Sequence, residues 1–484
     1  MEKSLNILMG LVFYPRGGSA QVVRYLSRAL IALGHRVHLV TGSLHDENPQ
    51  HDARVFFDDL PLTVVDYSDA WRGHREGKDP ISSAWAIPFH PSYEDKPGVP
   101  DRVFYKVNEE VYPALTRCWE TPFQKLGSHF QPDILHLHHL NHMHHAAMAT
   151  FAEAAKATQL HGTELKMLEN MAVLENVGKQ KQRQQFWREI LEQAARGMDH
   201  FFAISSDVRQ KASDLLAIDD RAITTIFNGV DVSLFRPRDW SADQKLGFLS
   251  EILVKNPQGW DETSAPGSIT YSEADLARFS FTPDKGTGRL KPLVLYVGRF
   301  LDFKRVPLLI QAVHAVNGMF PEGADGPPYN LLVWGGMPGE WEGEHPYTLT
   351  RQLGLTNVFF SGWLPHNVLS EGFNLADLFV APSYYEPFGQ VFLEAMATRL
   401  PVIATRSGGP LNFVVDSGPE ANGWFCEVDK VTSLAKSIHT ALIDPQGRAR
   451  RGSNALALIR SRYDWLQIAR QYLQIYFRLV TEAR

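Results

Sequence analysis

Cysteine, net charge and long apolar runs are all scarce in this sequence of 484 residues. Only Cys118 and Cys426 occur, far apart, so a disulfide scaffold is not expected and a reducing cytoplasm suits the chain. The formal net charge of −6 gives no general attraction to nucleic acids or acidic membranes. No apolar run reaches the roughly 18–20 residues that span a bilayer, and the first residues show no secretory signal pattern. We therefore expect a cytoplasmic protein without a transmembrane segment or a nucleic-acid partner.

Two common phosphate-binding signatures are also missing. The turn after the first predicted strand contains Gly17 and Gly18, but not the G-x-G-x-x-G spacing of a nicotinamide site or the G-K-[ST] ending of a P-loop. Two interpretations of the paired glycines are open. They form a tight turn, or they let a phosphate or sugar approach the N–H groups of a helix that opens at Ser19.

The sequence is too long for one ordinary core, so two domains are expected. In the first, an apolar run, a turn, a helical pattern and a second apolar run follow one another, as in a right-handed crossover unit. The predicted strands are residues 5–13, 36–41, 133–140, 159–161 and 200–204, and the first helix is residues 21–33. The second domain repeats the pattern with strands 293–297, 330–334, 358–361, 378–381 and 402–404, and helices 306–316, 347–353 and 388–398. Both domains are predicted to be α/β, each with a doubly wound parallel sheet.

The predicted boundaries follow composition. Residues 1–236 are predicted to form the first domain, and residues 291–463 the second. Residues 237–290 are polar and predict a linker or insertion with a short helix at 272–279. The stretch 67–113 is rich in aromatics and has no period, so it predicts a surface excursion. An amphipathic helix at 464–484 is expected to pack back on the first domain. Ligands should bind in a cleft at the carboxyl ends of the strands.

Two carboxylates, Glu386 and Glu394, bracket a segment that follows the strand at 378–381. Proline suits a first helical position, so we expect a helix to begin near Pro387. The N–H groups at its open end would face an anion or hydroxyls, and they belong to Phe388, Gly389 and Gln390. Glu394 should lie roughly 10–12 Å further along the axis, at about 1.5 Å per residue. Two acceptor carboxylates so spaced can hold both ends of a nucleotide-sugar.

Two cations follow the first predicted strand of the second domain. Arg299 ends this strand and Lys304 lies in the loop before the next helix, so both should reach the same edge of the sheet as Glu386. Fixed cations there stabilise the charge that develops on a departing diphosphate without a metal. The alternative is an ordinary surface pair after a strand.

Histidines and a basic helix allow further interpretations. His161 follows a strand end, where it can hydrogen-bond a sugar hydroxyl, although a lone histidine is often structural. A cluster between residues 136 and 145 invites a zinc interpretation, but it has no neighbouring cysteine. Its members are His136, His138, His139, His142, His144 and His145. We expect polar lining of the acceptor side and no metal. The basic helix at 179–188 can touch a membrane, but its few apolar residues favour a solvated face.

Taken together, the motifs resemble the retaining family 4 glycosyltransferases of the GT-B fold. The matching segments are residues 15–18, 161–162, 227–231, 297–300 with Lys304, 361–363, 386–394 and 407–409. The resemblance implies two Rossmann-like domains that face each other across a cleft, with residues 1–236 on the acceptor side and residues 291–463 binding the nucleotide-sugar. It also implies a reaction: transfer of a hexose from a nucleoside-diphosphate sugar to a hydroxyl acceptor, with retention of configuration and without a cofactor. A UDP-sugar is the favoured donor and GDP-mannose the second.

The same resemblance assigns residue roles. Arg299 and Lys304 would bind the donor diphosphate, and His161 would contact the sugar near the reacting carbon. The remaining donor contacts would come from Gly17, Gly18, Trp363, Glu386, Phe388, Gly389, Gln390 and Glu394, with Glu386 on the sugar, Glu394 on the ribose and Trp363 near the base. Two alternatives are open: a phosphorylase or epimerase on the same fold, and a catalytically silent nucleotide-sugar-binding protein. The intact charged residues argue against the silent protein.

Overall fold

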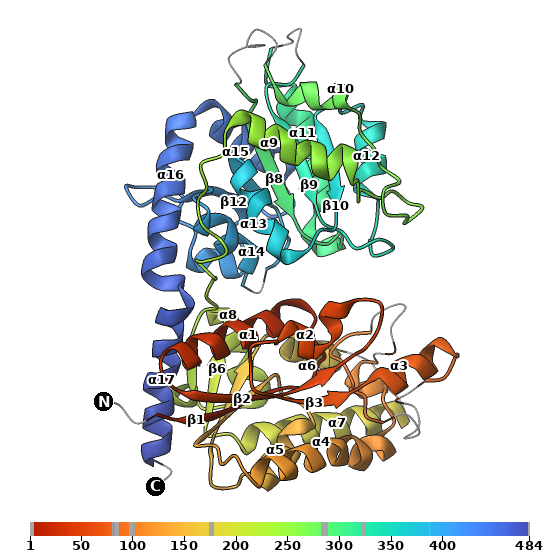
Figure 1. Cartoon of the computed structure of the whole chain (residues 1–484), viewed down its shortest axis with the longest axis vertical. Helices are drawn as coiled ribbons and strands as arrows, with labels where there is room; N and C mark the ends of the chain where they lie inside the picture. The colour runs from red at the N-terminus through yellow and green to blue at the C-terminus, as the bar shows by residue number, and fades with distance from the viewer. Residues whose placement is uncertain are drawn as a thin grey trace. The chain divides into compact units, whose positions relative to one another are not determined.

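The computed structural model describes residues 4–79, 81, 87–95, 100, 102–173, 179–281, 289–321, 326–386 and 388–482. Contacts within the chain divide it into two compact units. Unit 1 comprises Met1–Gly229 and Trp465–Arg484, and unit 2 comprises Val230–Asp464. Each unit is a parallel β-sheet with helices on both faces (Figure 1). The prediction of an α/β chain with two doubly wound parallel sheets is therefore confirmed.

The sheet of unit 1 has the strand order β3-β2-β1-β4-β5-β6-β7, and all neighbours pair in parallel. The strands are β1 (Asn6–Leu11), β2 (Arg36–Ser43), β3 (Leu62–Asp66), β4 (Ile134–His138), β5 (Ala155–Leu160), β6 (His200–Ala203) and β7 (Ile223–Thr225). The order reverses direction between β1 and β4, and ligands of open α/β sheets bind at such a switch point. The sequence did not reveal β3 and β7, which are the two edge strands, nor the polar start of β5.

Figure 1 shows α1 on one side of this sheet and α4, α5 and α7 on the other. The helices of unit 1 are α1 (Gly17–Ala32), α2 (Ala53–Phe56), α3 (Ser68–Arg75), α4 (Tyr112–Gly127), α5 (Met143–Thr150), α6 (Thr163–Val173), α7 (Lys179–Arg196), α8 (Ser206–Leu216) and α17 (Trp465–Glu482). Helix α7, the predicted basic helix, buries Trp187, whose indole N–H donates to the carbonyl of Val107 at 2.9 Å. One face of α7 is thus covered by unit 1.

Two helix starts differ from the prediction. Helix α1 begins at Gly17, not at Gln21, so both glycines lie in its first turn. Helix α14 (Gln390–Ala397) begins after Gly389, so the predicted start near Pro387 is wrong, and Pro387 itself lies outside the described residues. Gly17 and Gly389 have φ angles of 69° and 96°, which glycine adopts readily. In both cases a left-handed glycine, not a proline or serine, leads the chain into the helix.

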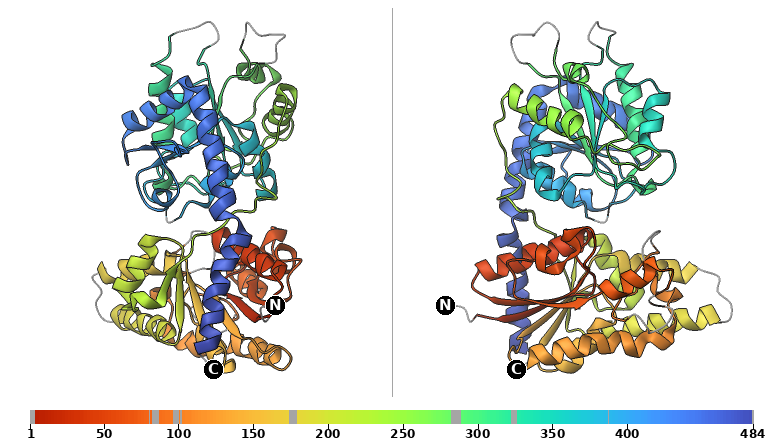
Figure 2. Two further views of the ribbon diagram at one scale, coloured as in Figure 1. Left: turned by 90° about the vertical axis from the view of Figure 1, so that its left-hand side faces the viewer. Right: turned by 45° about the vertical axis from the view of Figure 1, so that its right-hand side comes forward.

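The sheet of unit 2 has the order β10-β9-β8-β11-β12-β13, again with parallel pairs. The strands are β8 (Leu293–Val297), β9 (Asn330–Trp334), β10 (Val358–Gly362), β11 (Leu378–Ala381), β12 (Val402–Thr405) and β13 (Gly423–Cys426). Both views in Figure 2 show helices on both faces of this sheet. The switch point lies between β8 and β11. Only β13, a short edge strand, was not predicted.

The helices of unit 2 include segments that the sequence analysis treated as a linker. They are α9 (Ala242–Ser250), α10 (Glu273–Leu276), α11 (Val306–Asn317), α12 (Pro346–Gln352), α13 (His366–Leu375), α14, α15 (Val431–Ile443) and α16 (Pro445–Leu458). Helices α9 and α10 lie in the predicted linker, and each begins with a capping box, at Ser241 and Ser272 respectively. Between them Trp260 is buried and donates to the carbonyl of Gly336 at 2.8 Å. These residues therefore form part of the fold of unit 2.

Helix α17 completes unit 1 from the far end of the sequence. The hydroxyl of Tyr472 donates to Gln159 Oε1 at 2.6 Å, and that of Tyr476 forms a hydrogen bond with His136 Nδ1. Both tyrosines are buried, so the apolar face of this helix covers β4 and β5. Within the described part of the chain, no helix combines the length and the apolar character needed to cross a membrane.

Candidate active site

The switch point of unit 2 holds a direct ion pair between Lys304 and Glu386. Lys304 Nζ lies 2.5 Å from Glu386 Oε2, and only 18% and 14% of the two side chains are exposed. Ser383 Oγ donates to the same carboxylate oxygen at 3.3 Å. Because β8 and β11 are neighbours, the loops that follow them meet at one edge of the sheet. The structure thus brings together two of the predicted site residues.

Backbone contacts hold this pair in place. The N–H of Tyr384 donates to the carbonyl of Phe303 at 2.7 Å, which ties the loop after β11 to the turn Asp302–Lys304. The N–H of Gly409 donates to the carbonyl of Glu386 at 2.7 Å. A Cβ atom at Gly409 would lie 2.1 Å from the carbonyl oxygen of Phe388, so only glycine permits this approach. The sequence predicted a glycine pair after β12 but not its role as the support of the Glu386 loop.

Within the chain, Arg299 is paired with a residue that the sequence analysis did not consider. Its guanidinium forms a two-point ion pair with Glu340, with Arg299 Nε 2.9 Å from Glu340 Oε2. The two side chains are 42% and 36% exposed, so the pair is accessible to a ligand. Glu340 was not recognised in the sequence. It follows β9, the neighbour of β8, so strand order alone would have placed its loop at the same edge of the sheet.

The other residues of unit 2 that were predicted to contact the donor lie on α14, directly before α14 and after β10. Glu394 is buried on α14, and Gly389 is the residue that precedes this helix. The N–H groups of Phe388 and Gly389 therefore lie before the helix and not within its first turn, whereas Gln390 is its first residue. Trp363 follows β10, the edge strand, and is 43% exposed. The structure does not join Trp363 to the Lys304–Glu386 pair by any contact among the described residues.

In unit 1, His161 belongs to a buried network at the carboxyl ends of β4 and β5. Its Nε2 lies 2.9 Å from Nδ1 of His138, and its backbone N–H donates to Glu164 Oε1 at 2.9 Å. The other oxygen of Glu164 lies 3.1 Å from His139 Nδ1. Burial lowers the pKa of His161 well below its ordinary value, and the nearby charges of His139 and His136 lower it further. His161 is therefore neutral and shares one hydrogen-bond proton with His138.

Glu164 is a site residue that the sequence analysis missed. Burial opposes its ionisation, but His139 and the hydrogen bonds from His139 and the backbone together lower the pKa of Glu164. A fully buried carboxylate thus fixes both the backbone of His161 and the ring of His139. Glu164 lies in the first turn of α6, three residues after His161, and this spacing is the sequence signal that could have identified it.

Other histidines of the cluster form separate hydrogen bonds within unit 1. One joins His136 to Tyr476, and in another His144 Nε2 lies 3.0 Å from Thr158 Oγ1. Among the described residues, no group of three or more His, Cys, Asp or Glu side chains is arranged to hold a metal ion.

The predicted glycines Gly17 and Gly18 follow β1 in unit 1, and a Cβ atom at either would meet nothing within 4 Å. Open space therefore surrounds the start of α1.

Two family models match the sequence. The model described as Glycosyl transferases group 1 matches residues 281–457, and the one described as Glycosyltransferase Family 4 matches residues 16–234. The chain is 30% identical over 258 residues to D-inositol 3-phosphate glycosyltransferase of Corynebacterium efficiens, covering 49% of this chain and 59% of that protein. It is 30% identical over 216 residues to glycogen synthase of Mycobacterium tuberculosis, covering 43% and 48%. The chain thus spans about half the length of these curated relatives.

Solved structures share the fold over nearly the whole chain. Sucrose-phosphate synthase from Thermosynechococcus elongatus superposes with a TM-score of 0.60 and 19% identity, covering 99% of this chain and 100% of that one. The Anabaena protein HepE in complex with UDP gives a TM-score of 0.61 and 16% identity, with coverages of 97% and 99%. At these identities the likeness concerns the fold alone.

Proposed function

Because the chain belongs to glycosyltransferase family 4, we propose that it transfers a hexose from a nucleoside-diphosphate sugar to a hydroxyl acceptor. The observation that carries this proposal is the Lys304–Glu386 pair at the switch point of unit 2. A cation and an acceptor-only carboxylate, side by side and largely buried, suit the two halves of such a donor. The ammonium binds the diphosphate, and the carboxylate accepts hydrogen bonds from sugar hydroxyls.

In the structure these two charges satisfy each other. When a donor enters, its diphosphate takes the place of Glu386 beside Lys304, and its hydroxyl groups take the place of Lys304 beside Glu386. Neither charge is left unpaired in either state, so little desolvation cost opposes the exchange. As the sugar bond breaks, the leaving diphosphate gains negative charge, and Lys304 is already positioned to stabilise it.

Arg299 and Glu394 complete the proposed donor site. Arg299 exchanges its exposed partner Glu340 for the diphosphate, for which a guanidinium is a bidentate donor. Glu394, on α14, accepts hydrogen bonds from the ribose, while Trp363 lies near the base. In unit 1, the neutral His161 hydrogen-bonds the transferred sugar, and Gly17 and Gly18 leave room for the donor at the start of α1.

A UDP-sugar is the first choice of donor and GDP-mannose the second. The order follows how common UDP-sugars are as donors, and HepE of Anabaena is one protein of this fold that is described in complexes with UDP and with UDP-glucose. We further propose that configuration at the anomeric carbon is retained. The transfer is proposed to need no metal, because Lys304 and Arg299 supply the positive charge that a divalent cation would otherwise bring to the diphosphate.

A thermal-shift screen of UDP-, GDP- and ADP-sugars tests donor binding, because a ligand of the native state raises the melting temperature. The stabilising donor is then incubated with candidate hydroxyl acceptors, with and without EDTA, and the anomeric configuration of the product is determined by NMR. We expect transfer that is insensitive to EDTA. Donor binding without hydrolysis or transfer would support a silent binding protein instead, and dependence on inorganic phosphate would support a phosphorylase.

A further inference from the structure

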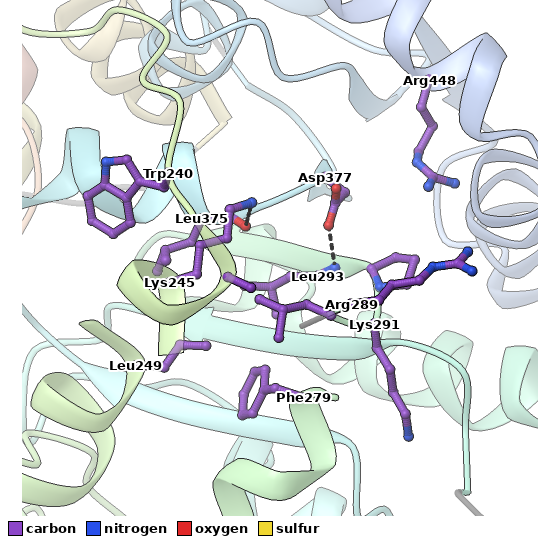
Figure 3. A pocket seen from close by; sticks show the side chains of 13 residues that line it. Trp240, Lys245, Leu249, Phe279, Arg289, Lys291, Leu293, Leu375, Asp377 and Arg448 are labelled. Atoms are coloured by element: carbon purple, nitrogen blue, oxygen red, sulfur yellow. Dashed lines mark hydrogen bonds between the residues drawn. The ribbon is translucent and has the colours of Figure 1, made fainter. Parts of the chain in front are cut away.

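A pocket of about 330 Å³ opens in unit 2 where the strands begin (Figure 3). Leu293, in its lining, is the first residue of β8, and Asp377 directly precedes β11. Lys304 and Glu386 follow the opposite ends of these same two strands. The length of β8 separates the two places by on the order of 15 Å. The pocket is therefore distinct from the proposed donor site.

Positive charge dominates the lining of this pocket. Lys245, Arg289 and Arg448 contribute long cationic side chains, and Asp377 is the one carboxylate among the lining residues. Figure 3 shows Arg289 and Arg448 on one side of Asp377 and Lys245 on the other, with Lys291 extending away from them. Asp377 Oδ2 accepts the backbone N–H of Leu293 at 2.8 Å. In the part of the chain that the structure describes, neither Asp377 nor any other carboxylate forms an ion pair with these three cations.

The three cations retain donors for a ligand. Lys245 Nζ donates to the carbonyl of Leu375 at 3.0 Å, which uses one of its three N–H groups. Arg448 donates through Nη1 to the carbonyls of Ala441 and Leu442 at 2.5 and 2.7 Å, which uses two of its five N–H groups. Burial lowers the pKa of Arg448, so a bound anion would relieve a cost that the folded chain already carries. The exposed Arg289 lies over the ring of Phe281, with its guanidinium carbon 5.4 Å from the ring centroid.

Apolar side chains form the rest of the lining. Trp240 stands at one side, and Leu249, Phe279 and Leu293 lie below it in Figure 3. Leu249, Phe279 and Leu293 are buried, whereas the partly exposed Trp240 offers a sugar or base ring attached to a phosphate a surface to pack against. A concave pocket of a few hundred Å³ with a few convergent polar groups is the usual form of a small-molecule site. We propose that this pocket binds a small phosphate monoester that carries a sugar or a nucleobase ring.

Calorimetric titration of the full chain tests this proposal. The probes are glucose 6-phosphate, AMP and inorganic phosphate, with glucose and adenosine as uncharged counterparts. We expect one of the two esters to bind more tightly than inorganic phosphate, and the uncharged compounds not to bind. The ester that binds identifies the ring. In the double variant Lys245→Gln/Arg289→Gln, the dissociation constant should rise about tenfold or more, since each phosphate contact is charge-assisted.

Two matched variants distinguish binding in this pocket from binding elsewhere on the chain. Lys436→Gln/Arg351→Gln removes the same charge from exposed positions of unit 2 outside the lining and should leave the affinity within about twofold. Lys304→Met alters the proposed donor site and should also leave the affinity of this pocket for the ester unchanged. The proposal is overturned if neither ester binds at millimolar concentration, if both double variants weaken binding equally, or if binding is lost in Lys304→Met but kept in Lys245→Gln/Arg289→Gln.

Discussion

Lys304 and Glu386 are 82 residues apart in the sequence, and their charged groups lie 2.5 Å apart in the fold. Each side chain is largely buried. In the proposed donor site, both charges of this pair bind the donor. The ion pair also gives both residues a measurable part in stability, which allows binding and folding effects to be separated by experiment.

The first prediction concerns this pair. Glu386→Gln and Lys304→Met should each lower turnover by roughly 10²–10³-fold, the usual cost of removing one electrostatic contact to the transition state. Lys304→Met leaves a largely buried carboxylate without its cation, so the free energy of unfolding should also fall by about 1–3 kcal/mol. The double variant removes both charges and should recover stability but not activity. Urea denaturation and a transfer assay measure the two effects.

Asp429→Asn is a suitable control for these variants. It breaks the ion pair with Arg305, the residue next to Lys304, at a position whose left-handed backbone asparagine tolerates. Its activity should stay close to that of the natural chain. Full turnover in Glu386→Gln would refute the assigned role of the carboxylate.

The second prediction concerns competition for Arg299. Since Glu340 must release the guanidinium before a diphosphate can bind it, Glu340→Gln should tighten donor binding, by up to about fivefold for an exposed pair of this kind. The comparison is Glu344→Gln, which removes an exposed charge from the same loop. Calorimetric titration with the donor compares the dissociation constants of the two variants, and only Glu340→Gln should bind the donor more tightly. Weaker binding in Glu340→Gln would mean that Glu340 orients Arg299 instead of competing for it.

The third prediction concerns the support of the Glu386 loop. In Gly409→Ala the new methyl group would lie 2.1 Å from the Phe388 carbonyl oxygen, so the loop must move. We expect a loss of about 1–3 kcal/mol in the free energy of unfolding, together with a loss of donor affinity. Gly247→Ala, in α9, meets nothing within 4 Å and should be neutral or stabilising by about 0.5–1 kcal/mol. Unchanged donor binding in Gly409→Ala would show that the loop position is not critical.

The fourth prediction concerns acid stability. Burial lowers the pKa of His136, His142 and His144 to about 3 in the folded chain. Between pH 6.5 and about 3 the unfolded chain therefore binds more protons than the folded chain, and the free energy of unfolding should fall as pH falls. Each such histidine adds a slope of about 1.4 kcal/mol per pH unit within this window. Denaturant titrations at several pH values between 7 and 4 measure the total slope.

His142→Leu isolates one of these contributions. Neither ring nitrogen of His142 has a hydrogen-bond partner among the described residues. The leucine variant should be about 1–3 kcal/mol more stable at pH 7 and should show a slope smaller by the contribution of one proton. His129→Gln, at an exposed position, should change neither quantity. An unaltered slope in His142→Leu would contradict the assignment of a neutral, buried ring.

The central strands were predictable because they are buried on both faces and therefore appear as continuous apolar runs, as in β1, β8 and β11. The edge strands β3, β7 and β13 were missed, since β3 and β7 carry polar residues and β13 is only four residues long. The segment around Trp260 was also wrongly predicted from its local pattern. This segment is polar on average, so it predicted a linker, but one buried indole fixes it to unit 2.

The sequence by itself determined which chemical groups follow the strand ends: a cation at Lys304, a carboxylate at Glu386, a histidine at His161. Those positions depend on local patterns of apolar residues and turns, which are encoded over short distances. The tertiary structure decided the partners, so that Lys304 meets Glu386, Arg299 meets Glu340, and His161 meets His138 and Glu164. Partners come from strands that are distant in the chain, and strand order, which no local pattern encodes, sets which strand ends become neighbours.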